Sequence, residues 1–493
     1  MSATRFPIHD VLPDLRRVLE TRTRLVLEAP PGAGKTTQIA PALLDAPWLS
    51  GRKILMLEPR RLAARAAAEF MAAARGEAVG ATVGYRIRFE NRVSATTRIE
   101  VLTEGILTRL LQDDPELGGV GAIVFDEFHE RHLNADLGAV LAREVQATLR
   151  PDLRLIIMSA TLDGERIARW FDAGRLTSGG RGFPVRIAHP PACDNFAFAL
   201  RRSVASALDE CDGDVLVFLP GRREIERANA TLKDLVGGAS DEQHLDAPLD
   251  PRAAGGWRCA HPIEIVRLHG ELTLTEQHAV LEPAAHGIRR IVLATNIAES
   301  SLTLPGVRAV VDSGLARAPC FDPRSGFTRL ATVPVSQASA DQRAGRAGRL
   351  GPGICYRLWP QSRRLEQSTV PEIAEVELSQ LALELAVWGT GSHDWLDAPP
   401  AGALAQAREL LTTLGALDTD ARPTGLGRTM LRLGAAPRLA AAVLRAPAAQ
   451  KELACAIAAL IEARNPLRGE AGRSDDFRLR VDALRTWCKA DAP

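Results

Sequence analysis

Short apolar runs alternate with longer helical patterns over roughly the first 360 residues of the chain. Runs of four to six apolar residues between helices are typical of parallel strands, because helices cover both faces of a parallel sheet. The pattern therefore predicts an α/β fold with two wound parallel sheets. The strands expected in the first sheet are Arg24–Leu27, Ile54–Leu57, Ala122–Phe125 and Leu155–Met158, and those in the second are Val215–Leu219, Ile263–Leu268, Ile291–Ala294, Ala309–Val311 and Ile354–Arg357.

Two interruptions and one change of pattern suggest how the chain is divided. The boundary between the two sheets is expected near Pro184–Cys193, where HPPAC breaks the alternation, and Gly237–Pro262 has the turn-forming composition of a surface insertion. After Pro371 the alternation stops and helical stretches rich in alanine and leucine follow. The first of them is expected to be one helix that Gly389 ends.

Composition and charge describe an ordinary globular protein without a dominant polyanion surface. The 493 residues are 46% hydrophobic and 25% charged, only 4% are aromatic, and the net charge is +1. Any binding of nucleic acid must therefore come from local patches, such as Arg317–Glu366 with nine arginines against two aspartates and one glutamate. A solvated surface is an equally good interpretation of that segment alone.

The seven cysteines are scattered, without a C-x-x-C pair or a neighbouring histidine cluster. This spacing favours reduced thiols over disulfides or a zinc site, and it predicts a cytoplasmic protein. The amino-terminal residues lack an apolar signal core, and no uncharged apolar run reaches the length of a membrane span, so no membrane association is expected.

A phosphate-binding loop is the strongest local motif. It follows the expected strand Arg24–Leu27 and precedes a helix, which is the context such a loop requires. Its backbone N–H groups around Gly32–Gly34 can surround a β-phosphate, while Lys35 reaches the β- and γ-phosphates and Thr36 offers a hydroxyl to Mg²⁺. The residues expected to bind the nucleotide here are Ala29, Pro30, Pro31, Gly32, Ala33, Gly34, Lys35, Thr36 and Thr37.

An acidic pair follows the third expected strand, where Ala122–Phe125 leads into Asp126 and Glu127. Two carboxylates at the end of a buried parallel strand are costly unless they hold a metal or take part in chemistry. Asp126 is placed to hold Mg²⁺ and Glu127 to polarise an attacking water, and both belong with Thr36 to the expected metal site. Together with the phosphate loop, the pair predicts a nucleotide-hydrolysing site.

The motifs resemble, in their order, those of the DEAH-box RNA helicases of superfamily 2, with Phe128 in place of the usual alanine of the box. EAPPGAGKTT and LEPRRLAARAAA are similar in particular to the bacterial HrpB branch, and the resemblance covers about residues 15–440. It implies two RecA-like domains at 1–187 and 188–365, a winged-helix region at 366–435 and the start of a helical ratchet domain at 436–493. The family continues into an OB-fold, so a truncated chain is expected.

The resemblance also implies roles for residues at the strand ends of both sheets. In the first, His129 joins the catalytic set, Arg60, Arg61 and Thr103 contact the nucleic-acid backbone, and Ser159 and Thr161 contact the nucleotide. In the second, the expected backbone contacts are Gly221, Arg222, Thr295 and Asn296, and the expected nucleotide contacts include Asp312 and Gly314.

Gln342, Arg346 and Arg349 are spaced by four and three residues, which predicts that they share one face of one helix. Such a face suits a γ-phosphate and its attacking water across a domain interface, whereas a solvated stripe would not need two glycines within its helix. Between these motifs, Arg317–Val333 predicts a β-hairpin around Ser325–Gly326, where the family places a wedge for duplexes.

The sequence thus predicts a monomeric helicase or translocase that uses ATP and Mg²⁺ and moves along single-stranded RNA. Two alternatives stay open. The same motifs contact phosphates in DNA as well as in RNA, because only a contact to the 2′-hydroxyl separates them. A nucleic-acid-binding scaffold with residual ATPase is the other alternative, although the intact Lys35, Glu127 and Arg349 argue against it.

Overall fold

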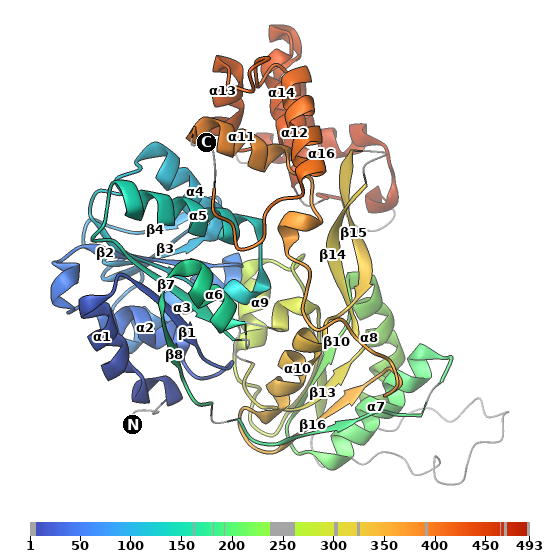
Figure 1. Ribbon diagram of the computed structural model, residues 1–493. Helices are drawn as coiled ribbons and strands as arrows, with labels where there is room; N and C mark the ends of the chain where they lie inside the picture. Colours follow the sequence, from blue (N-terminus) through green and yellow to red (C-terminus); the bar gives the residue numbers. More distant parts are fainter. Residues whose placement is uncertain are drawn as a thin grey trace. The chain divides into compact units, whose positions relative to one another are not determined.

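The computed structural model describes residues 6–160, 163–180, 182–191, 193–236, 262–299, 304–322, 326–389, 393–463, 465–467 and 471–490. The expected insertion between Gly237 and Pro262 lies outside the described residues except for Pro262 itself. The chain divides into two compact units, one formed by 1–320 with 330–372 and the other by 321–329 with 373–493 (Figure 1).

The first unit begins with an eight-stranded sheet in the order β4-β3-β5-β2-β6-β7-β1-β8. The pairings are parallel except that of β3 with β4. Its strands are β1 (Arg24–Glu28), β2 (Lys53–Glu58), β3 (Val83–Ile87), β4 (Glu90–Arg92), β5 (Ile99–Thr103), β6 (Val120–Phe125), β7 (Arg154–Ser159) and β8 (Gly174–Thr177). All four strands expected here are confirmed, whereas β3, β4, β5 and β8 were not anticipated.

Helices flank this sheet and supply its core (Figure 1). They are α1 (Leu12–Thr21), α2 (Lys35–Leu43), α3 (Arg61–Ala74), α4 (Glu104–Asp113), α5 (Leu133–Thr148) and α6 (Gly164–Phe171), with the 3₁₀ turn η3 (Phe128–Glu130) after β6. Apolar residues of α1, α2 and α3 join Met56, Val124 and Ile156 in one core cluster. Because the pairs of β1, β2, β5, β6 and β7 are parallel, their carboxyl ends meet at one edge of the sheet.

A second sheet follows in the same unit, with six parallel strands in the order β11-β12-β10-β13-β16-β9. These are β9 (Val185–Ala188), β10 (Asp214–Phe218), β11 (Ile263–Leu268), β12 (Arg289–Ala294), β13 (Val307–Asp312) and β16 (Gly353–Arg357). Helices α7 (Phe196–Glu210), α8 (Arg222–Val236), α9 (Leu274–Leu281) and α10 (Gln337–Gly345) accompany it, with the 3₁₀ turns η4 (Asn296–Ala298) and η5 (Arg346–Gly348).

The predicted domain boundary between residues 187 and 188 needs correction, because it falls within β9. This strand pairs with β16, so the second sheet already includes Val185. β9 is short and none of its residues is fully buried, which leaves no apolar run for a pattern search to find. Its pairing with a strand some 170 residues later is a long-range contact that local sequence does not indicate.

The hairpin strands expected between Arg317 and Val333 are confirmed as a separate two-stranded sheet of β14 (Leu315–Asp322) and β15 (Phe327–Pro334). Of the two residues expected at its turn, Ser325 lies outside the described residues. Gly326 has φ of 70°, a left-handed conformation that glycine adopts without steric cost. The wedge function of this hairpin stays a prediction.

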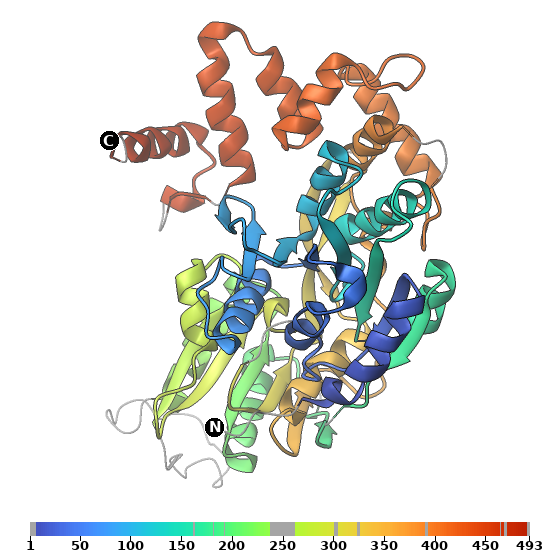
Figure 2. The same cartoon turned by 90° about the vertical axis from the view of Figure 1, so that its left-hand side faces the viewer.

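The second unit is helical, and Figure 2 shows its residues from Ser379 on, in orange to red, as helices joined by turns. The helices are α11 (Ser379–Trp388), α12 (Ala401–Thr413), α13 (Gly425–Leu433), α14 (Pro437–Arg445), α15 (Lys451–Glu462) and α16 (Phe477–Ala490). The helix expected from Pro371 begins only at Ser379, because Glu372–Ala374 forms a separate 3₁₀ turn and Glu377 accepts the amide hydrogen of Ser379. Gly389, with φ of 88°, ends it as predicted.

Leu417 and Pro423 form an isolated antiparallel bridge in this unit. The assignment of 366–435 to a winged helix and of 436–493 to a ratchet domain stays a prediction. Within the described parts of the chain, every helix is too short or too polar to cross a membrane.

Candidate active site

The phosphate loop connects the carboxyl end of β1 to the first residue of α2. Gly32 and Gly34 have φ of 84° and 91°, values that favour glycine over any side chain. At Gly34 a Cβ atom would also lie 2.9 Å from Phe6, so the position has no room for one. The two glycines therefore turn the chain into the amino terminus of α2, where free N–H groups and the helix dipole favour a phosphate.

Lys35, Thr36 and the acidic pair come together at this point. The Lys35 Nζ lies 2.6 Å from Glu127 Oε2 and 3.8 Å from Asp126 Oδ1, and the Thr36 hydroxyl donates a hydrogen bond to Asp126 Oδ2. Lys35, Asp126 and Glu127 are almost completely buried. Residues 90 positions apart in the sequence thus form one charged centre, as the two motifs predicted.

Burial and charge act against each other in this centre. Burial raises the pKa of Asp126 to about 6, although the charge of Lys35 opposes the change. Burial works in the same direction on Glu127, but the charge and hydrogen bond of Lys35 outweigh it, and the pKa of Glu127 falls to about 2. Glu127 is therefore ionised at neutral pH, which is the state that can polarise a water molecule.

His129 connects three of the motifs. Its Nδ1 accepts a hydrogen bond of 3.3 Å from the backbone N–H of Ala160, and its Nε2 lies 3.2 Å from Nε2 of Gln342. The same Nδ1 is 3.5 Å from Glu127 Oε2. Burial lowers the pKa of His129, so its ring is neutral at pH 7 and can both donate and accept. Ser159, which ends β7, is fully buried, and Thr161 lies outside the described residues.

The prediction that Gln342, Arg346 and Arg349 share one α-helix is wrong. Helix α10 ends at Gly345, and Arg346 starts the 3₁₀ turn η5, where its N–H donates to the carbonyl of Arg343 three residues earlier. Glycine weakens a helix, and the i−3 hydrogen bond is the pattern of the tighter 3₁₀ form. The turn also packs directly against the backbone of Phe183, because a Cβ at Gly348 would lie only 2.5 Å from the Phe183 carbonyl oxygen.

The tighter turn still brings Arg349 to the phosphate loop and Arg346 within electrostatic reach of Glu127. A Cβ at Gly32 would lie 3.8 Å from Nε of Arg349. Burial lowers the pKa of Arg349 to about 10, and Glu127 opposes the change, so the guanidinium stays charged at neutral pH. Arg346 is buried and donates from Nε to the carbonyl of Glu299 at 3.0 Å.

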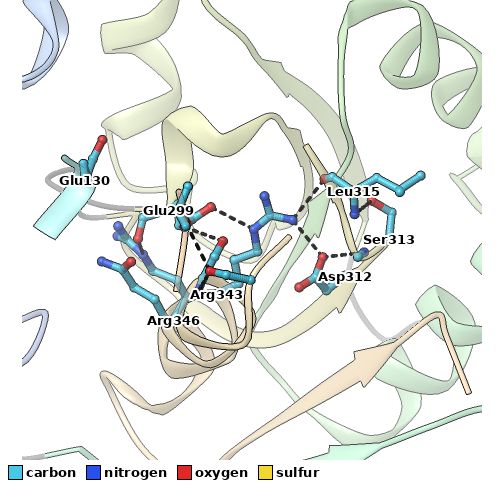
Figure 3. A network of polar contacts seen from close by, with 12 residues as sticks. Glu130, Glu299, Asp312, Ser313, Leu315, Arg343 and Arg346 are labelled. Carbon is cyan, nitrogen blue, oxygen red and sulfur yellow. Dashed lines mark hydrogen bonds and ion pairs between the residues drawn. The ribbon is translucent and has the colours of Figure 1, made fainter. Parts of the chain in front are cut away.

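Arg343, which we did not expect to matter, lies at the centre of the network in Figure 3. Its side chain is only 1% exposed, and it donates to Glu299 Oε2 and Asp312 Oδ1, both at 2.9 Å, and to the carbonyl of Leu315. The guanidinium also lies over the ring of Phe218, 4.8 Å from its centre. This network joins α10 to the segments that follow β12 and β13, and so it fixes the place of Arg346.

The expectation that Asp312 and Gly314 contact the nucleotide stays a prediction, and the network shows which other partners Asp312 has. Asp312 is fully buried, its carboxylate accepts from Arg343, and it also accepts from the backbone N–H of Gly314 at 2.9 Å. Both hydrogen bonds use Oδ1 and connect segments of the second sheet, while Oδ2 accepts none from the described residues. Sequence reasoning missed Arg343 because this residue lies off the helical face that the spacing of Gln342, Arg346 and Arg349 defined.

The residues expected to contact a polymer all follow strands at the carboxyl edges of their sheets. Arg61 and Asn296 are exposed, and Thr103 and Thr295 are partly exposed at the ends of β5 and β12. Gly221 directly precedes α8, which begins at Arg222, and Arg222 pairs with Glu226 at 2.7 Å and with Glu271 at 2.8 Å.

Arg60 is held more tightly than Arg222, because it is largely buried and one carboxylate binds both of its terminal nitrogens. Its two terminal nitrogens donate to both oxygens of Glu130, at 3.0 and 2.8 Å. His132 lies between Glu130 and Glu104, with ring nitrogens 3.5 and 3.4 Å from their carboxylates. Burial alone would lower the pKa of His132, but the hydrogen bond and charge of Glu104, with Glu130, raise it to about 9.

This raised pKa predicts how the network affects stability. The charged His132 ring stabilises the folded chain fully below pH 6.5, the approximate pKa of histidine in an unfolded chain. This stabilisation is lost as the pH rises through about 9. Because the ring is partly exposed, we discount the effect to about 1 kcal/mol. His132→Gln should therefore lower the thermal midpoint by a few degrees at pH 7 and by almost nothing at pH 10. An equal loss at both pH values would contradict a charged His132.

Arg61 carries a second prediction. Arg61→Ala should weaken polymer binding equally for all sequences and lower the slope of affinity against salt by about 1, while basal ATP turnover persists. Arg22→Ala is the matched control, since Arg22 is exposed and precedes β1 at the opposite edge of the sheet. Fluorescence anisotropy over a salt series measures both variants, and loss of affinity for selected sequences only would contradict a backbone contact.

Comparison with known proteins agrees with this geometry. The family model described as DEAD/DEAH box helicase matches residues 12–170, and the helicase conserved C-terminal domain matches residues 201–351. The chain is 44% identical over 465 residues to the ATP-dependent RNA helicase HrpB of Escherichia coli, covering 92% of this chain and 54% of that protein. It is 37% identical over 430 residues to the pre-mRNA-splicing factor ATP-dependent RNA helicase prp22 of Schizosaccharomyces pombe, covering 84% of this chain and 35% of that protein.

Among solved structures, the DEAH/RHA helicase HrpB of Escherichia coli matches with a TM-score of 0.84 and 40% identity. The match covers 99% of this chain and 61% of that one, and the chain spans about half the length of the bacterial relative. The two RecA-like domains expected from the sequence are confirmed by these matches. The chain therefore belongs to the DEAD/DEAH-box helicases and is similar to their HrpB members.

Proposed function

We propose that this chain hydrolyses ATP and couples the hydrolysis to movement along RNA or to its unwinding. The observation that carries the proposal is the buried centre of Lys35, Asp126 and Glu127 beside the phosphate loop, with the guanidinium of Arg349 next to Gly32. A donor lysine, an ionised carboxylate and an arginine around one loop are the parts that phosphoryl transfer to water requires.

The residues of this centre suit Mg²⁺. Thr36 and Asp126 offer a hydroxyl and a carboxylate, which are the hard oxygen ligands that this ion prefers. When bound, Mg²⁺ would neutralise charge on the phosphate oxygens. The part of Glu127 is to orient and polarise the attacking water, while Lys35 and Arg349 donate to the γ-phosphate.

Movement requires that the state of the nucleotide changes the contacts to the nucleic-acid backbone. His129 touches the segments of Ala160 and Gln342, so a change around the γ-phosphate can reach both sheets. We infer that ATP holds the two RecA-like domains together and that hydrolysis releases them, which shifts the backbone contacts in each cycle. These contacts predict weak sequence preference and strong salt dependence.

RNA is our proposed substrate because the relatives with the same motifs are named RNA helicases. DNA remains the second candidate, since the proposed contacts are to phosphates. Steady-state ATP turnover without polymer, with poly-RNA and with single-stranded DNA separates the candidates. Stimulation by RNA alone supports the proposal, equal stimulation by DNA favours a general translocase, and no turnover under any condition would leave only a binding scaffold.

Two further features remain proposals. The described cysteines are free thiols, which accords with the cytoplasmic location that their scattered spacing predicts. A monomer is proposed as the working form, and sedimentation with and without RNA tests it. An activating protein partner is not specified by any described residue.

A further inference from the structure

Glu58 places a third carboxyl group beside the proposed metal site. It ends β2, and β2 pairs in parallel with β6 so that Leu57 lies opposite Phe125. The backbone N–H of Asp126 continues the pairing by donating to the carbonyl of Leu57 at 3.1 Å. Side chains at matching positions of neighbouring parallel strands, about 4.8 Å apart, point to the same side. Glu58 is therefore the direct neighbour of Asp126 at the carboxyl edge of the sheet.

The Glu58 carboxyl is buried without a hydrogen-bond donor. The residue is 0% exposed, and neither carboxyl oxygen accepts a hydrogen bond from any described residue. Buried carboxyl oxygens nearly always have a partner, because leaving them without one is unfavourable. By contrast, Glu100 on the adjacent strand β5 is also buried but pairs with Lys53 at 2.6 Å and Arg86 at 3.2 Å. The unsatisfied oxygens of Glu58 thus point to a partner supplied by the ligand.

Charge indicates what that partner is. Glu58 interacts electrostatically with Asp126, Glu127 and Lys35, and it adds a third carboxyl group to a buried site in which Lys35 is the ion-paired cation. Water molecules polarised by a cation would supply the donors that the two Glu58 oxygens lack. Within the described ranges, no three acidic, histidine or cysteine side chains are arranged to bind a metal directly. Glu58 would therefore act through water.

We propose that Glu58 is a positioning residue that accepts hydrogen bonds from the water molecules around the Mg²⁺ held by Thr36 and Asp126. The inference rests on the proposed function, because it is that function which brings the ion to the site. Mg²⁺ retains several of its waters in proteins, and outer carboxylates fix their orientation. Glu58 thereby sets the affinity for the ion, whereas Glu127 acts on the attacking water.

Glu58→Gln in the full chain tests this role, since glutamine keeps the size and removes the charge. With ADP bound, the dissociation constant for Mn²⁺, measured by electron paramagnetic resonance, should rise by about tenfold. Affinity for ADP without metal should not change. The Mg²⁺ concentration for half-maximal ATP turnover should rise by a similar factor, while turnover at saturating Mg²⁺ falls by less.

The matched control is Glu100→Gln, which removes a buried carboxylate from the same sheet but away from the loop. It should lower the thermal midpoint and leave Mn²⁺ affinity unchanged. An unchanged Mn²⁺ affinity in Glu58→Gln, or an equal change in both variants, would overturn the proposal. If Glu58→Gln does not fold, Glu58→Asp replaces it, with weakened Mn²⁺ binding expected because the carboxylate withdraws by one methylene. Absence of ATP turnover in the unmodified chain would refute the proposed function instead, and Mn²⁺ affinity would still decide the role of Glu58.

Discussion

Glu127→Gln should lower ATP turnover by about 10³-fold while ATP binding stays nearly unchanged, which is the scale for loss of a general base. Glutamine keeps the size of Glu127, and its carbonyl can still accept from Lys35, whose Nζ lies 2.6 Å from Glu127 Oε2. What disappears is the negative charge, which Lys35 preserves by holding the pKa of Glu127 at about 2. Single-turnover kinetics and nucleotide titration on one preparation measure both effects.

Lys35→Ala gives the contrasting result, because it removes the charged donor to the γ-phosphate. Turnover should be lost together with affinity for ATP, whereas Glu127→Gln should trap ATP and keep nucleotide-dependent RNA binding. If Glu127→Gln loses ATP binding as Lys35→Ala does, Glu127 is part of the binding site rather than the base. The two variants therefore separate binding from chemistry within one buried centre.

The strands and the phosphate loop could be predicted because their signals are local. Most of the expected strands are apolar runs with a charged residue at an end at most, and those of the first sheet are buried at nearly every position. The loop has its own constraint, since Gly32 and Gly34 need left-handed backbone that other residues avoid. Asp126 and Glu127 follow a strand directly, so parallel topology alone brings them to the loop.

The features that were missed depend on contacts between distant segments. Arg343 looked like a spacer within its motif, and only the fold brings Asp312 and Glu299 to its guanidinium. Glu58 looked like the end of an apolar strand, and its importance appears only when β6 places Asp126 beside it. The end of α10 at Gly345 could be predicted in part, because glycines within the motif weaken a helix. The close packing of Gly348 against Phe183 could not be predicted, because it depends on a distant segment.

Arg349→Ala should lower ATP turnover by about 10³-fold and leave nucleotide affinity largely intact, the scale typical for an arginine finger. Arg349 directly follows η5 in the second RecA-like domain, yet its side chain lies beside Gly32 in the phosphate loop of the first domain. A guanidinium in this place stabilises charge that develops on the γ-phosphate in the transition state, so it matters for turnover more than for binding. Stimulation by RNA should also vanish, because RNA would act by favouring the arrangement that holds Arg349 there.

The alternative treats Arg349 as part of a solvated basic stripe that binds RNA, and it predicts the opposite pair of results. Basal turnover would then be nearly normal in Arg349→Ala, and RNA affinity would fall. Arg364→Ala is the matched control, since Arg364 is exposed in the same arginine-rich segment. We expect Arg364→Ala to retain turnover, with RNA affinity changed slightly or not at all. Turnover and RNA affinity measured in both variants decide the matter, and normal basal turnover in Arg349→Ala would exclude that residue from the hydrolytic site.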